Sequence, residues 1–170
     1  MLGTLMFSSK IIMEVLPNIH LLGTLTMVYT VTFRAKALIP LSVFIMLTGL
    51  YALLFSGATG WMWWLPYLYI WLPLWAITML LPQGMSKKVK RVVYPLVCCL
   101  HGLTYGILYA PAQAFLYGFT KEQTLTWILV GLPWDLLHGV SNLFVGCLIL
   151  PLSELLQKLM RKVEIGRAHV

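Results

Sequence analysis

Of the 170 residues, 60% are hydrophobic and only 10% are charged, which excludes a soluble domain and a disordered tail. A net charge of +7 would suggest nucleic-acid binding in a soluble protein, but in so apolar a chain it indicates loops that face anionic lipid. We therefore predict an all-α integral membrane protein, surrounded by membrane lipid and without a nucleic-acid partner.

Most of the positive charge lies in three clusters with apolar sequence between them. The clusters comprise Arg34 and Lys36; Lys87, Lys88, Lys90 and Arg91; and Lys158, Arg161 and Lys162. Between successive clusters there is room for two membrane crossings, and cytoplasmic loops retain Lys and Arg. The pattern predicts a six-transmembrane-helix bundle with cytoplasmic N- and C-termini.

The apolar runs predict the crossings in chain order. They cover residues 2–16, 19–33, 37–55, 61–81, 92–119 and 125–156. The first is short for a bilayer core that requires about 20 helical residues. The fourth ends at the helix-stopping sequence Pro82-Gln83-Gly84, and we expect Pro133 to break or kink the long sixth helix.

We expect residues 1–163 to form a single domain whose N-terminus is truncated, since the first helix begins abruptly at Leu2. Residues 164–170 back-translate naturally into the start of a common sequencing adapter. This hypothesis makes residues 164–170 a non-native, adapter-derived tail.

Three polar residues share one face of the sixth predicted helix. Asp135, His138 and Asn142 follow i, i+3, i+7 spacing and span an arc of about 60°. An Asp at the bilayer centre costs about 2.5–3.5 kcal/mol, so this face must point to the bundle interior or a cavity. It either joins helices through hydrogen bonds or serves a ligand, and a metal centre would require a further ligand from another helix.

The fifth predicted helix carries two stripes at four-residue spacing. The polar stripe is His101, Tyr105, Tyr109 and Gln113, and the small-residue stripe is Gly102, Gly106, Ala110, Ala114 and Gly118. Small residues let membrane helices approach closely, either within the bundle or between subunits. The polar side chains either line a cavity or hydrogen-bond to neighbouring helices.

Lys10 and Glu14 form an i,i+4 pair deep in the first predicted helix. They either neutralise each other or leave one charge to meet a charged group on a substrate. Pro17, Asn18 and His20 follow in the first external loop, where they would lie at an entrance to the bundle.

Aromatic residues crowd the outer start of the fourth predicted helix: Trp61, Trp63, Trp64, Tyr67, Tyr69 and Trp71. They form either an interfacial aromatic belt or a stacking surface for a flat heterocycle. The chain contains no GxxxxGK[ST], HExxH or GxSxG motif, and we predict no enzyme and no catalytic residue.

Three segments carry a resemblance to a known family: residues 9–20, residues 109–114, and residues 131–142 with the pattern Pro133-Trp-Asp135, His138 and Asn142. The chain resembles the substrate-binding (S) components of energy-coupling factor (ECF) transporters, most closely a Firmicutes-type subgroup. The resemblance covers residues 1–162.

The resemblance implies a multi-pass subunit of the bacterial cytoplasmic (inner) membrane with no chemistry of its own. Such subunits capture a vitamin-like substrate near the outer face and associate with a transmembrane coupling subunit and two cytoplasmic ATPase subunits. In the family, small residues of the first helix contact the coupling subunit. The nearest matches here are Gly3, Thr4 and Ser8.

We therefore predict an ECF-type importer subunit that binds a small heterocyclic micronutrient, without cofactor or metal. The substrate-binding set is Trp63, Trp64 and Tyr67 for stacking, Asn18, His20, Tyr109 and Gln113 for hydrogen bonds, and Asp135, His138 and Asn142 for binding or coupling. One alternative is a small membrane enzyme or metal-dependent protein using His20, His101, Asp135 and His138. Another is an assembly subunit without a ligand.

Overall fold

The computed structural model describes residues 1–16 and 18–168, and the side chains up to residue 162. This part of the chain is helical and contains no strand, so the predicted all-α class is confirmed for it. Pro17, which the sequence places in the first external loop, lies outside the described residues, as do residues 169–170.

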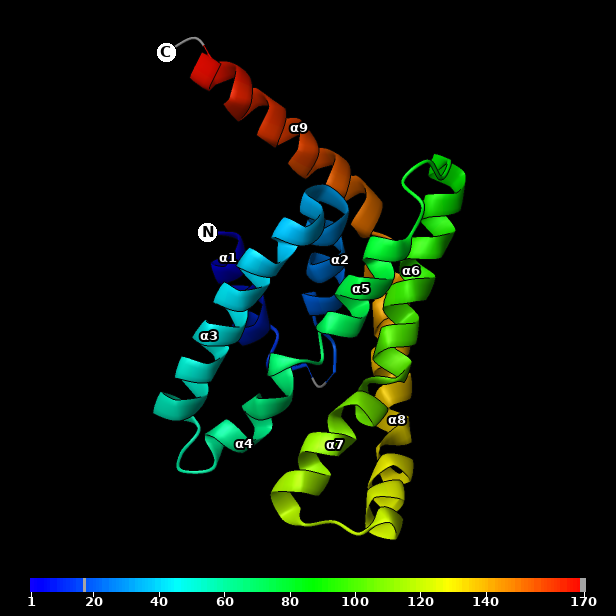
Figure 1. Cartoon of the computed structure of the whole chain (residues 1–170). Helices are drawn as coiled ribbons and strands as arrows, with labels where there is room; N and C mark the ends of the chain where they lie inside the picture. Colours follow the sequence, from blue (N-terminus) through cyan, green and yellow to red (C-terminus); the bar gives the residue numbers. More distant parts are fainter. Residues whose placement is uncertain (17, 169–170) are drawn as a thin grey trace.

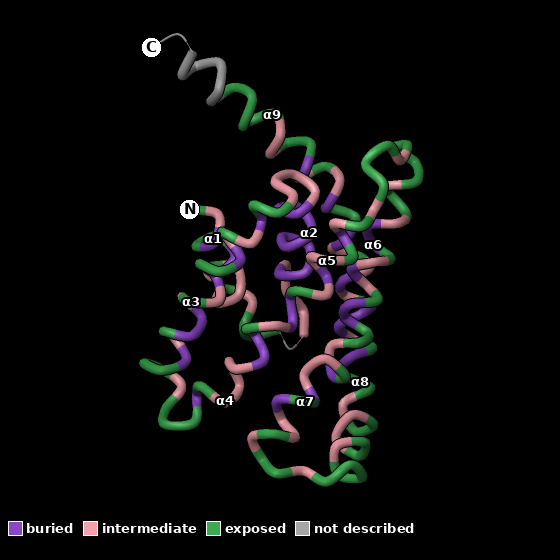
Figure 2. The backbone as a smooth tube through the Cα atoms, viewed as in Figure 1, coloured by how far each residue is buried: buried purple, intermediate pink, exposed green. Residues whose placement is uncertain are grey.

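The first four elements are α1 (Leu2–Ile12), α2 (Leu22–Phe33), the 3₁₀ turn η1 (Arg34–Ala37) and α3 (Leu38–Phe55). Helix α2 is the centre of the fold: every residue from 22 to 30 is buried (Figure 2). Helix α1 packs against α3, and a Cβ on Gly3 would lie 2.6 Å from the Pro40 carbonyl oxygen. Glycine is therefore required where these two backbones meet.

The fourth predicted helix consists of three pieces. These are α4 (Gly60–Trp64), η2 (Leu65–Leu68) and α5 (Leu72–Leu80). Pro66 lies in the first turn of η2 and Pro73 in the first turn of α5. Proline has no N–H to donate, so both residues lie where a helix starts and the missing donor costs little.

The fifth predicted helix is interrupted once. It is formed by α6 (Lys87–Leu103) and α7 (Tyr105–Tyr117), which meet at Thr104. The Ser86 hydroxyl caps α6 by accepting from the Val89 N–H, so the basic residues 87–91 lie in the first turns of a helix. Helix α7 ends at Gly118, whose φ of 66° favours glycine.

The sixth predicted helix is formed by α8 (Lys121–Gly146) and α9 (Ile149–Ala168). Helix α8 runs continuously through Pro133, so the predicted break at that residue is wrong. The chain breaks at residues 147–148, which leaves Pro151 in the first turn of α9, where a missing N–H costs little. Residues 164–168 of the predicted foreign tail continue α9.

Four segments of the described chain are long and apolar enough to cross a membrane: Leu22–Phe55, Gly60–Leu80, Lys87–Tyr117 and Lys121–Gly146. The first contains both α2 and α3, which turn back on each other at η1 (Figure 1), and α1 is a shorter apolar helix. Large apolar side chains such as Phe55, Phe115 and Phe144 are exposed, as expected of helices that face lipid. The architecture is that of a multi-pass helical membrane protein.

The three basic clusters gather at one end of the molecule. The α2–α3 turn, the α5–α6 connection and α9 lie at this end, and the α3–α4 and α7–α8 loops lie at the other (Figure 1). An ion pair of 2.7 Å between Lys87 Nζ and Glu154 joins α6 to α9 there. Packing thus brings together charges that are far apart in the sequence.

Candidate functional site

The polar face of α8, formed by Asp135, His138 and Asn142, is buried, as its spacing predicts. The three side chains make different interactions. Both carboxylate oxygens of Asp135 accept from the Gly106 N–H, at 3.0 and 3.1 Å, in the first turn of α7. The Asn142 Nδ2 donates to the Cys98 carbonyl of α6 at 3.2 Å. These two residues join α8 to α6 and α7, and Asp135 provides the acceptor at the break in the fifth helix.

The small-residue stripe allows this close packing. A Cβ on Gly106 would lie 2.3 Å from Asp135 Oδ2, and one on Gly102 would lie 2.9 Å from the backbone of Gly139 on α8. At these two positions the stripe serves packing within the chain, the first of the two alternatives. Gly118 is exposed and instead ends α7.

His138 has a different environment from its two neighbours on α8. Its ring lies edge-on to His20 and to Tyr105, with ring centroids 4.7 Å apart in both pairs. Only 1% of the residue is exposed, yet neither ring nitrogen has a hydrogen-bond partner in the described part of the chain. A fully buried imidazole without partners is costly unless something else binds it.

His138 belongs to a group that we call the histidine cluster: His20, His101, His138, Trp71 and Tyr105. The His101 ring lies 5.6 Å from Trp71, and Trp71 lies 6.3 Å from His20. Its residues come from the α1–α2 loop, from the start of α5, and from α6, α7 and α8. Five separate segments therefore converge on one point around α2.

Unpartnered polar atoms concentrate in and beside this cluster. Six of the twelve such atoms among the described residues lie here: His20 Nδ1, His101 Nδ1, both ring nitrogens of His138, Trp71 Nε1 and Asn142 Oδ1. A buried donor or acceptor without a partner costs about 1–3 kcal/mol. The local concentration of such atoms is typical of a site that is completed by a bound molecule or by ordered water.

The imidazole in the α1–α2 loop is uncharged at neutral pH. Burial lowers the pKa of His20 from its ordinary 6.5 to about 4, and the nearby His101 and Lys10 make smaller contributions in the same direction. A neutral imidazole offers one donor and one acceptor. The cluster therefore presents hydrogen bonds and aromatic surface and lacks a strong local charge.

Three of the four residues of the alternative metal centre lie in the histidine cluster, but they are not placed to hold a metal ion together. In the described residues, no group of three or more His, Cys, Asp or Glu side chains is placed to hold a metal ion. Asp135 binds the α7 backbone and His101 Nε2 lies 2.9 Å from the Ile70 carbonyl. His20 and His138 remain in contact with each other.

Of the three predicted stacking residues, Trp63 and Tyr67 lie edge-on to each other with ring centroids 5.9 Å apart, and Trp64 is bound elsewhere. Trp64 Nε1 donates to the Ile45 carbonyl at 2.9 Å, and the Trp64 ring fills the space over Gly49, so this residue fastens α4 to α3. The Trp63 ring lies beneath the Lys10 ammonium, 5.1 Å from its centroid. Only Tyr67 adjoins the histidine cluster, with its ring centroid 5.8 Å from that of Trp71.

Tyr109, Gln113 and Asn18 lie around the cluster. Tyr109 stacks on Tyr105 at 5.8 Å, and its hydroxyl donates to the Trp63 carbonyl. Gln113 is half-buried, one turn further along α7. Asn18 is half-buried in the α1–α2 loop, where its φ of 57° places it in the left-handed region that Asn tolerates.

The predicted Lys10–Glu14 pair forms. Lys10 Nζ lies 3.4 Å from Glu14 Oε1, and the Tyr51 hydroxyl donates to the other carboxylate oxygen of Glu14. The Lys10 side chain is only 11% exposed and also lies over the Tyr51 ring. Mutual neutralisation within the bundle accounts for both charges.

The residues predicted to meet a coupling subunit are only partly accessible. Thr4 and Ser8 are exposed on α1. Gly3 is buried against Pro40 and Val43 of α3, which corrects its assignment to a partner surface. The spacing of small residues did not reveal this, because both kinds of interface use them.

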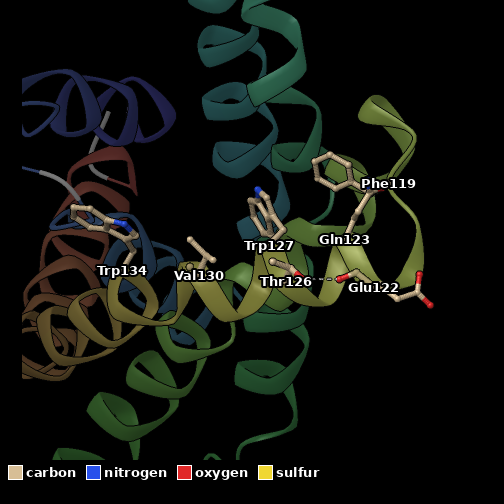
Figure 3. Close-up of a pocket in the computed structure, with 8 residues that line it drawn as sticks. Phe119, Glu122, Gln123, Thr126, Trp127, Val130 and Trp134 are labelled. Carbon is tan, nitrogen blue, oxygen red and sulfur yellow. Dashed lines mark hydrogen bonds between the residues drawn. The ribbon is translucent and has the colours of Figure 1, made fainter.

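A hollow of about 600 Å³ lies between the end of α7 and α8, and none of the predicted site residues lines it (Figure 3). Phe119, Trp127, Val130 and Trp134 line it, with Glu122 near the α7–α8 loop. Trp near a helix end, as Trp127 is in α8, is typical of a side chain at the membrane–water interface. The hollow is wide and open, unlike the histidine cluster.

The substrate-binding set predicted from sequence lacks Trp71, His101 and Tyr105, although the polar stripe and the aromatic crowding contain all three. No protein-family model, curated protein or solved structure matches this chain. The site is therefore argued from its own geometry.

Proposed function

We propose that this protein is the substrate-capture subunit of an ECF-type importer and that the histidine cluster binds the substrate. The observation that carries the proposal is the concentration of buried polar atoms without partners around His20 and His138. A bound molecule with both donors and acceptors would complete those hydrogen bonds. A wrong ligand would leave them unpaired, which is how such a site discriminates.

The membrane arrangement belongs to the same proposal. Six crossings would be formed by α1, α2, α3, the α4–α5 segment, the α6–α7 segment and α8, and α9 would extend on the cytoplasmic side. The gathering of the basic clusters at one end supports a cytoplasmic location for that end and for both termini. The membrane would be the bacterial cytoplasmic membrane.

The substrate would be a small planar heterocycle of the vitamin type. His20, Trp71, Tyr105 and His138 would surround its ring, because each contributes either an aromatic face or an unpartnered nitrogen. Asp135 and Asn142 would act as positioning residues, since their own hydrogen bonds hold α8 in place.

Transport would be driven by other subunits. No phosphate-binding GxxxxGK[ST] loop exists in the sequence, so a coupling subunit and two cytoplasmic ATPases would supply the energy. The exposed residues Thr4 and Ser8 of α1 remain candidates for contact with the coupling subunit.

Native mass spectrometry of the full chain, purified gently from cells grown in rich medium, tests this function. We expect one small organic molecule per protein, and its mass would identify the substrate. His138→Ala should lose the adduct, whereas Thr126→Ala, which changes an exposed hydroxyl of α8, should keep it. Retention of the adduct by both His20→Ala and His138→Ala would overturn the site assignment.

A further inference from the structure

A second site lies at the basic end of the bundle, away from the histidine cluster. A cavity of about 180 Å³ opens between α2, the α5–α6 connection, α6 and α9. We call it the basic pocket and define it by its polar lining: Arg34, Thr78, Gln83, Lys90, Tyr94 and Gln157. These residues come from all three basic regions of the sequence, and only the fold brings them together.

Arg34 is held in the pocket by its backbone and by one side-chain bond. It has a positive φ of 56°, a conformation that non-glycine residues adopt rarely and that is found at functional sites. One terminal nitrogen of its guanidinium donates to the Met79 carbonyl at the end of α5. A guanidinium carries five N–H donors, so this bond uses only part of its capacity.

The basic pocket is lined by the cations Arg34 and Lys90 and by no described carboxylate; the Glu154 carboxylate, which Lys90 influences, belongs to the neighbouring hollow. Two basic residues elsewhere in the described structure form ion pairs with carboxylates. Lys10 pairs with Glu14, and Lys87 pairs with Glu154 in the neighbouring hollow. Two cations that share a partly enclosed space repel each other unless an anion lies between them.

We propose that the basic pocket binds a phosphoryl group, supplied either by the headgroup of an anionic phospholipid or by a free phosphate. An arginine donates two parallel hydrogen bonds to phosphate oxygens, and a lysine contributes a point charge. The amides of Gln83 and Gln157 and the Tyr94 hydroxyl add neutral donors. Basic pockets between membrane helices on the cytoplasmic side suit such headgroups.

A phosphoryl group bound in the basic pocket would add hydrogen bonds between separate elements of the fold. A phosphoryl group at this point would bridge η1 through Arg34, α6 through Lys90 and α9 through Gln157. Binding to the folded state alone raises stability in proportion to the logarithm of ligand concentration. The bundle should therefore be more stable in anionic lipid.

Thermal unfolding of the full-length protein in neutral detergent tests the proposal. The probes are phosphatidylglycerol, zwitterionic phosphatidylcholine and inorganic phosphate, each titrated separately. We expect phosphatidylglycerol to raise the midpoint and phosphatidylcholine to leave it unchanged. A rise with inorganic phosphate as large as that with phosphatidylglycerol would identify free phosphate as the source.

Variants separate a pocket from general surface charge. Lys90→Gln should weaken the phosphatidylglycerol effect roughly tenfold in apparent affinity, since a charge-assisted hydrogen bond is lost. Arg34→Gln should weaken the phosphatidylglycerol effect to a similar degree. Because it also removes the hydrogen bond to the Met79 carbonyl, this variant can fail to fold, and the Lys90→Gln result then decides the test. Lys36→Gln is the matched control, because Lys36 is exposed beside the same turn and lies outside the pocket.

Three results would overturn the proposal. The first is an equal rise with phosphatidylglycerol and phosphatidylcholine. The second is an equal loss in Lys36→Gln and Lys90→Gln, which would indicate diffuse attraction to the basic end. The third is an unchanged midpoint with every probe.

Discussion

The histidine cluster in the middle of the bundle and the basic pocket at its end differ in what they lack. The cluster has aromatic surface and three imidazoles, and four of their ring nitrogens have no hydrogen-bond partner among the described residues. The pocket has two cations without a facing carboxylate in that same part of the chain. One region needs hydrogen bonds and the other needs negative charge, so the two should select different ligands.

The two regions should also respond differently to pH and to salt. Arginine and lysine stay charged across the physiological pH range, while a buried imidazole changes state if it gains a proton. Salt screens attraction between an anion and partly exposed cations but barely affects hydrogen bonds in a dry site. Four predictions test this contrast and the frame that holds both regions.

The largest effect should come from the frame around the cluster. Gly106→Ala would place a methyl group 2.3 Å from Asp135 Oδ2 and displace the carboxylate from the backbone N–H. We expect the free energy of unfolding to fall by about 2–4 kcal/mol in a detergent–denaturant titration. Gly131→Ala, where nothing lies within 4 Å of the new Cβ, is the control and should be neutral or slightly stabilising.

A pH titration should distinguish the two regions. The folded protein keeps His20 neutral down to about pH 4, whereas the unfolded chain binds that proton near pH 6.5. The unfolded state therefore takes up more protons in this window, and stability that is fully present above pH 6.5 is lost as the pH falls toward 4. We expect a loss on the order of 1–3 kcal/mol, and His20→Gln should reduce the slope of the profile, while the buried His101 and His138 keep part of it.

An equal pH dependence in the wild type and His20→Gln would contradict the neutral, buried state of this imidazole. Lys90→Gln in the basic pocket should leave the shape of the profile unchanged, because Lys90 is a cation throughout the window.

Replacing His138 by phenylalanine should reverse the usual cost of a core substitution. His138→Phe keeps a planar ring and removes two nitrogens that have no partners in the described structure. We expect the ligand-free protein to gain about 1–2 kcal/mol of unfolding free energy while its small-molecule adduct disappears. A variant that is less stable than the wild type in the absence of ligand would show that the nitrogens are already satisfied.

The smallest effect should come from the exposed ion pair at the basic end. Lys87 lowers the pKa of Glu154 by hydrogen bonding, and Arg91 and Lys90 add to the effect. Because the pair is solvated, Glu154→Gln should not change the thermal midpoint measurably. It should also leave the phosphatidylglycerol response intact, since Glu154 lies outside the basic pocket; a lost response would mean that the two hollows act as one.

The predicted elements were most accurate where the signal is local. Apolar runs indicated the helical segments, and the i, i+3, i+7 spacing correctly placed Asp135, His138 and Asn142 on one buried face. The Lys10–Glu14 pair also followed from spacing alone. These features depend on the geometry of a single helix, which repeats regardless of what surrounds it.

The positions where the helices are interrupted were harder to predict from the sequence. Pro133 suggested a break that α8 does not have, and the interruption at Thr104 has no proline of its own. That interruption is accompanied by a bond from Gly106 to Asp135 on another helix. A helix end stabilised by a distant side chain has little signature in its own segment.

By itself, the sequence determined an all-helical, membrane-like chain with its charges in three groups and a polar face on its last long apolar helix. Only the tertiary structure decided that the side chains of Asp135 and Asn142 form hydrogen bonds while that of His138 does not. It also decided that Trp64 fastens α4 to α3. It also brought His20 against His138 and Arg34 beside Lys90. The reason is physical: helical periodicity states which residues share a face, whereas the partner of that face depends on how all the helices pack.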